Sequence, residues 1–252
     1  MDDLAGALSM AGLLFARCGG LLAVVPPLNV RCVPVTLRLG LAAVLAVALL
    51  PVAPAVEGLE GAPPAGYLAL LLQEAAIGVA AGFAGALVYW AFFIAGQLLD
   101  SVLGAGTAAE RSAGRGPVAG FVYVLAAVAL VAADGHHLLL EALAGSLREL
   151  PPGGGWSQGG LRGLPGLAGM MLVTGVSIAA PALAAIYAAE VALAAFDRVA
   201  PGLGLAQAAP AVRWTSGLLG LIVTVPLLGP VVAAQGLRAA EAVQVAFRML
   251  GG

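Results

Sequence analysis

Ionisable side chains interrupt the apolar stretches of this sequence at three places, Arg17, Glu74 and Glu190. A charge at membrane depth is costly, so it is normally paired or functional. A proton or ion path needs several carboxylates or histidines in series, whereas the carboxylates here are scattered. The pattern therefore favours a structural role, a buried ion pair between Arg17 and Glu74 that fixes the register of two helices.

The sequence offers little material for a catalytic or metal centre. His136 and His137 are adjacent, so on a helix they point in different directions and one metal ion would not easily bind both. We interpret them as a polar cap at the end of an apolar segment. There is no GxSxG, HExxH or GxxxxGK[ST] motif, and all eleven basic residues are arginine. We expect no enzyme activity, no metal and no cofactor.

The elements that must position these side chains are membrane helices. Of the 252 residues, 62% are hydrophobic and 10% are charged, against about 45–50% and 25% in soluble domains. Such a chain needs a bilayer or a large partner to cover its apolar surface. The net charge of −2 without a basic stripe excludes nucleic-acid binding.

Runs without charge place the segments. A spanning helix needs about 20 mostly apolar residues. The runs are 4–16 and 18–30 (divided by Arg17), 39–56, 75–99, 116–133, 163–189 and 214–237. The sequence therefore predicts an all-α polytopic membrane protein with about six membrane-type segments. Prolines inside the late runs, Pro181, Pro226 and Pro230, predict kinked helices.

Small residues lie close together in the run 75–99. Gly78 and Gly82 form a GxxxG pattern, which lets two helix backbones approach closely. The pattern can serve packing within one chain or a seam between subunits, and it favours packing within the chain.

Several short motifs, in order, resemble the FliR family of flagellar export-gate proteins, called SctT in injectisomes. The opening runs from Leu14-Phe15-Ala16-Arg17 through Pro26-Pro27 to Arg31-Cys32-Val33-Pro34 and Arg38-Leu39-Gly40-Leu41. The later motifs are Gln73-Glu74-Ala75-Ala76-Ile77-Gly78, Ala95-Gly96-Gln97-Leu98-Leu99-Asp100, Asp134-Gly135-His136-His137-Leu138-Leu139, Ser146-Leu147-Arg148 with Leu150-Pro151, and Asp197-Arg198-Val199-Ala200-Pro201. Each motif alone is weak, but their order and spacing are specific.

The resemblance implies a fold and a role. It implies a single FliR-like export-gate domain of kinked helical hairpins, with a FliP-like part over roughly 1–160 and a FliQ-like hairpin over 161–252. It implies a structural subunit of the gate in the bacterial inner membrane, at the basal body of the secretion apparatus. The implied partners are FliP-like and FliQ-like subunits, FlhB-like and FlhA-like export proteins, and unfolded export substrates. The residues expected to act in structure or assembly are Arg17, Pro34, Glu74, Gly78, Gly82, Gln97, Asp100, Gly135, His136 and Pro201.

The segment 100–116 is small, polar and rich in glycine, and together with the resemblance it predicts a movable plug in the conduit. Val102 and Leu103 are the expected sealing groups, because apolar constrictions can close a pore by excluding water. The other plug residues are Gly104, Gly106, Glu110, Arg111, Gly114 and Gly116. The alternative is a plain surface loop.

Two other functions remain open at this point. One is the injectisome counterpart of the same gate subunit. The other is a small secondary transporter with a binding site at broken helices. A gate subunit would co-purify with two different small membrane proteins, whereas so short a transporter would form an oligomer of identical chains.

Overall fold

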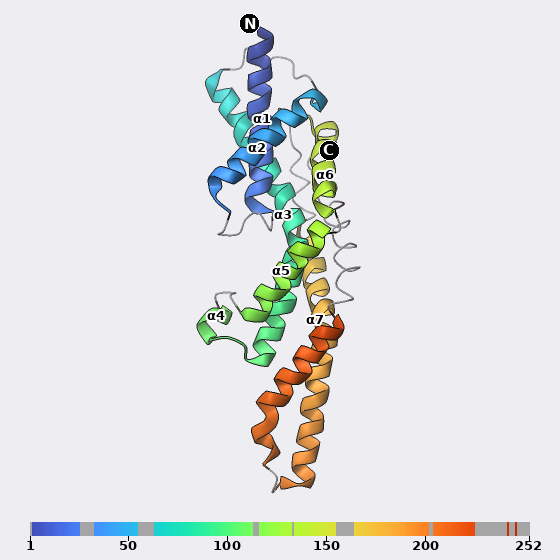
Figure 1. Cartoon of the computed structure of the whole chain (residues 1–252). Coiled ribbons are helices and arrows are strands. Elements are labelled where there is room, and N and C mark those ends of the chain that lie inside the picture. The colour runs from blue at the N-terminus through green and yellow to red at the C-terminus, as the bar shows by residue number, and fades with distance from the viewer. Residues whose placement is uncertain are drawn as a thin grey trace. The chain divides into compact units, whose positions relative to one another are not determined.

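The computed structural model describes residues 2–25, 33–54, 63–112, 116–132, 134–154, 164–201 and 204–224, with the isolated positions 241 and 245. All regular structure within these ranges is helical, and no strand occurs in them (Figure 1). The α-helices are α1 (Asp2–Val24), α2 (Val35–Leu49), α3 (Pro64–Leu103), α4 (Ala108–Ser112), α5 (Pro117–Ala132), α6 (Gly135–Glu149) and α7 (Leu164–Val199). The 3-10 helices are η1 (Leu50–Val52) and η4 (Leu205–Ala208), and residues 209–224 form a further α-helix.

Four helical stretches are long and apolar enough to cross a membrane: Ala5–Val24, Val35–Val52, Pro64–Leu87 and Gly169–Val199. Two shorter apolar stretches, Tyr89–Leu103 and Pro117–Ala129, accompany them. The prediction of an all-α polytopic membrane protein is confirmed. The run 75–99 belongs to the 40-residue helix α3, which is about twice the length that one crossing needs.

Two details of the segment prediction differ from the structure. Helix α6 was not predicted, because Glu141, Arg148 and Glu149 break its apolar run, although its other face is buried. The last predicted segment, 214–237, is helical up to residue 224, and the remainder, with Pro226 and Pro230, lies outside the described residues. Pro181 lies inside α7, as the sequence predicted.

The chain divides into two compact units. The first comprises Met1–Val88, Asp134–Ala168 and Gln235–Gly252, and the second comprises Tyr89–Ala133 and Gly169–Ala234. The FliP-like and FliQ-like parts remain a prediction.

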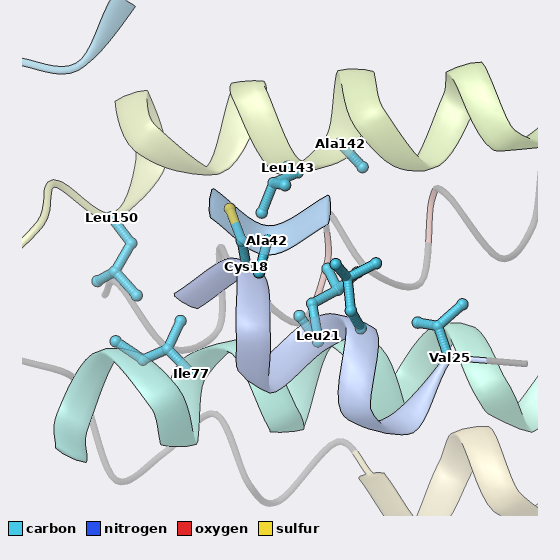
Figure 2. Close-up of a cluster of buried hydrophobic side chains, with 10 residues drawn as sticks. Cys18, Leu21, Val25, Ala42, Ile77, Ala142, Leu143 and Leu150 are labelled. Atoms are coloured by element: carbon cyan, nitrogen blue, oxygen red, sulfur yellow. The ribbon is translucent and has the colours of Figure 1, made fainter. Parts of the chain in front are cut away.

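The core of the first unit lies where α1, α2, α3 and α6 meet. Figure 2 shows Cys18, Ile77, Leu143 and Leu150 directed toward one another. A second cluster extends this core with Leu13, Leu14, Ala46 and Leu147. Because α6 contributes to both clusters, its apolar face is part of the core rather than a surface feature.

Glycines set the distance between α1 and α3. A Cβ at Gly78 would overlap the backbone carbonyl of Arg17, and one at Gly82 would lie 2.7 Å from the Leu21 carbonyl oxygen. On the other helix, a Cβ at Gly20 would overlap the Ala75 carbonyl. The GxxxG pattern therefore serves packing within the chain, which confirms the favoured interpretation.

The second unit contains a helical hairpin with an antiparallel seam. Gly220 lies against Ala182 and Gly217 lies against Ile186, so the small residues of the helix 209–224 let it pack closely on α7. Elsewhere in this unit the end of α3 packs on α5, where a Cβ at Gly96 would overlap the backbone of Ala119.

We expect Gly78→Ala to destabilise the protein by about 1–3 kcal/mol, because the added methyl group pushes two helix backbones apart. Gly19→Ala is the matched control in α1, since a Cβ there meets nothing within 4 Å among the described residues. The control should be neutral or stabilising by up to about 1 kcal/mol. Thermal unfolding midpoints in detergent measure both, and equal midpoints would contradict the packing account.

Candidate functional site

A buried ion pair joins α1 to α3. Arg17 Nε lies 2.6 Å from Glu74 Oε2, and the two side chains are 1% and 0% exposed. The predicted pairing of Arg17 with Glu74 is therefore confirmed. Because both charged groups are removed from water, the cost of burying them must be offset by their interaction with each other and by their other hydrogen bonds.

The same guanidinium also caps the end of α6. Arg17 Nη1 donates to the Leu150 carbonyl at 2.9 Å and to Ser146 Oγ at 3.2 Å. The last carbonyls of a helix lack partners within the helix, and a positive charge there interacts favourably with the helix dipole. Arg17 thus links α1, α3 and α6 through one side chain.

Glu74 and its neighbour Gln73 hold the turn that follows α6. The Gly153 backbone N–H donates to Glu74 Oε1 at 2.9 Å, and Gln73 Nε2 donates to the Gly154 carbonyl. Both oxygens of Glu74 therefore have partners. This favours the structural interpretation of the pair, because a proton carrier would need a carboxylate oxygen open to water or to a second titratable group.

The 100–116 segment begins at the end of α3 and ends at the start of α5. Gly104 and Gly106 have φ of 66° and 67°, so each turns the chain in a conformation that favours glycine. Leu103 is buried within the second unit, where it packs beside Gly217, and Val102 is half-buried. The Gly114 position and the Arg111 side chain lie outside the described residues.

A short helix inside this segment has its own cap. Thr107 and Glu110 form a capping box at the start of α4: the Thr107 N–H donates to Glu110 Oε2 at 2.6 Å, and the Glu110 N–H donates to Thr107 Oγ1 at 3.2 Å. Hydrogen bonds to the Glu110 carboxyl from the Thr107 backbone N–H and, second, from the Thr107 side chain hold the pKa of this carboxyl below its ordinary value. The sequence carries the signal for this cap, a threonine three residues before a glutamate, although the cap was not among the predicted features.

The remaining predicted residues are dispersed. Pro34 immediately precedes α2, Gly135 begins α6, and Pro201 is exposed beyond the end of α7. Gln97 is half-buried on α3, and its Nε2 has no partner among the described residues. The side chain of His136 lies outside the described residues, and the neighbouring His137 Nδ1 lies 3.4 Å from Asp134 Oδ1.

Comparison with known proteins identifies the family. The family described as bacterial export proteins, family 1, matches residues 8–237. The chain belongs to this family. It is 26% identical over 223 residues to the flagellar biosynthetic protein FliR of Pectobacterium carotovorum subsp. carotovorum, covering 86% of this chain and 84% of that protein. It is 27% identical over 221 residues to FliR of Escherichia coli (strain K12), covering 85% and 83%.

Family membership confirms the resemblance drawn from the short motifs, and it makes the chain an integral membrane component of a bacterial export apparatus. Arg17, Glu74 and Asp100 all lie within the matched region. The buried contacts of these residues therefore lie within the part of the chain that matches the family.

The sequence did not predict the ion pair that holds the hairpin of the second unit. Arg213 Nε lies 2.5 Å from Glu190 Oε1 and joins the helix 209–224 to α7, with side chains 37% and 27% exposed. Together with Leu193, Ala194, Asp197 and Ala209, the two residues line a cavity of about 260 Å³. Partial exposure screens this pair, so removing one partner should cost far less than it does in the buried pair.

Arg17→Ala should destabilise the protein by about 3–5 kcal/mol, because it leaves the Glu74 carboxylate buried without its counter-ion. The yield of assembled export complex measures the loss. The double change of Arg17 and Glu74 to methionine should recover part of the yield, since no buried charge remains.

Arg213→Ala is the matched control for a partly exposed pair and should cost no more than about 1 kcal/mol. If Arg17→Ala assembles as well as Arg213→Ala, the buried pair does not hold the first unit together.

The cap of α4 should depend on pH. Because the folded pKa of Glu110 is lowered, its contribution is present above the unfolded pKa and is lost as the pH falls through the folded pKa. The Thr107 amide should therefore exchange faster with solvent at acidic pH, after correction for intrinsic exchange. In Glu110→Gln the same amide should show no such change, and an identical pH profile in both proteins would contradict the assignment.

Proposed function

We propose that this chain is a structural subunit of the flagellar type III protein export gate and forms part of the conduit for unfolded export substrates. The observation that carries the proposal is the family match over residues 8–237. Both FliR relatives named above are flagellar proteins, so an injectisome subunit is not favoured. A family of export proteins equally disfavours a secondary transporter.

The proposed partners follow from the family resemblance. They are FliP-like and FliQ-like subunits within the gate, FlhB-like and FlhA-like export proteins beside it, and the unfolded substrates that pass through. The gate would lie in the bacterial inner membrane, in the basal body. Exposed apolar side chains on α7, such as Val173, Val191 and Phe196, support a chain that packs against lipid or other subunits.

The chain itself would perform no chemistry. In this proposal ATP hydrolysis and the proton-motive force act through other subunits, and the chain contributes helices that line and seal the conduit. The two oxygens of Glu74, both engaged in hydrogen bonds, support a scaffold rather than a proton relay.

Purification in mild detergent tests the assembly. A tagged chain should co-purify with two different small membrane proteins, and expressed without them it should aggregate or be degraded, because its apolar faces exceed what its own helices bury. A long-lived, monodisperse lone chain, or an oligomer of identical chains, would contradict the gate assignment.

We further propose that the 100–116 segment seals the resting conduit, with Val102 as the apolar sealing group. Leu103, which was expected to act with it, is buried against Gly217 and would have to move to face a conduit. Deleting residues 104–114 should raise the ion conductance of the resting complex in planar bilayers while leaving its subunit composition unchanged. Gly120→Ala, an open position on α5, is the control and should not leak. An unchanged conductance in the assembled deletion complex would show that the seal lies elsewhere.

A further inference from the structure

Asp100 is a fully buried carboxylate near the end of α3, and it serves a different helix. Its Oδ1 accepts the Val118 N–H at 3.0 Å, and its Oδ2 accepts the Ala119 N–H at 2.8 Å. These are the second and third residues of α5, whose N–H groups have no carbonyl partner within their own helix. A side chain of α3 therefore caps the N-terminus of α5.

The residue at the capping position of α5 makes room for this carboxylate. Gly116 precedes the first helical residue, Pro117, and has no side chain that could cap the helix. A Cβ at Gly116 would overlap the Asp100 carboxylate. The glycine is thus required by the close approach of Asp100.

The backbone carbonyl of Asp100 accepts a hydrogen bond at the start of the 100–116 segment, where α3 ends. The Ala105 N–H donates to the Asp100 carbonyl at 3.0 Å, with Gly104 in the left-handed conformation, which is the arrangement of a Schellman motif at the end of α3. A Cβ at Gly106 would lie 3.2 Å from Pro117 Cδ, so the outgoing and returning chains touch.

We propose that Asp100 is the positioning residue of the 100–116 segment: it terminates α3 with its carbonyl, starts α5 with its carboxylate, and so keeps the two ends of the segment together. The anchor stands on the contacts above, and only its consequence for the seal rests on the proposed function. Both carboxylate oxygens are needed, because an asparagine would replace one of them with an NH2 donor that faces a backbone N–H.

Hydrogen exchange of the assembled complex tests the contacts. In the wild type the Val118 and Ala119 amides should exchange slowly, although the first turn of a helix lacks internal partners. Asp100→Asn and Asp100→Ala should each accelerate them about tenfold, while Gly120→Ala should not. Fast exchange of these amides in the wild type would overturn the proposal without any variant.

A double-mutant cycle tests the role of Gly116. Gly116→Ala should lower the yield of assembled complex when Asp100 is present and should cost nothing further in Asp100→Ala, because the clash disappears with the carboxylate. If Gly116→Ala is tolerated as well as Gly120→Ala in the presence of Asp100, the close approach does not exist and the proposal fails.

A relocated cap separates positioning from capping. Asp100→Ala combined with Gly116→Asp places a carboxylate on α5 itself but leaves α3 unlinked. Slow exchange of Val118 and Ala119 should return, whereas trypsin cleavage after Arg111 should stay about tenfold faster than in the wild type. Cleavage after Arg148 on α6 is the internal control. If both readouts return to wild-type values, Asp100 only caps α5.

Conductance recorded on the same complexes distinguishes the two proposals. If exchange and cleavage change as expected in Asp100→Ala and the resting conductance does not, the anchor stands and the proposed seal fails. If the conductance rises and the Val118 and Ala119 amides remain slow, the anchor fails.

Discussion

A buried guanidinium needs hydrogen-bond acceptors from the protein, and Nε and Nη1 of Arg17 find them at α3 and at the end of α6, while Nη2 has no partner among the described residues. Its position fixes α1 against α3 through Glu74 and against the end of α6 through Leu150. The backbone of Arg17 also lies against Gly78, so the charged contact and the close glycine packing specify the same register. Removing the cation would affect the core of the first unit and the turn that follows α6.

In the second unit a buried negative charge, that of Asp100, likewise binds the end of a helix. Asp100 satisfies backbone N–H groups at the start of α5, as Arg17 satisfies carbonyls at the end of α6. Each charge has the sign that the dipole of its helix end prefers. The chain has few charged residues. Its buried charges bind helix ends that apolar surroundings separate from solvent.

This arrangement fits a gate component better than a transporter or an enzyme. The buried charges make contacts that hold helices, and the exposed surface of the hairpin formed by α7 and 209–224 is largely apolar. Small residues such as Gly217 and Gly220 are used inside the hairpin, so its larger apolar side chains remain available to lipid or neighbouring subunits.

The sequence by itself determined the membrane class, most of the helical segments, the family and the pairing of Arg17 with Glu74. These follow from local signals: charge-free runs, ordered motifs and lone charges in apolar surroundings. Only the tertiary structure showed that Asp100 caps α5, that Arg213 binds Glu190 and that α6 contributes to the core. Asp100 binds backbone N–H groups, which no residue type marks in the sequence. Arg213 is one of several charges near the ends of apolar runs, so its partner is not specified, and charges on its outer face interrupt the apolar pattern of α6.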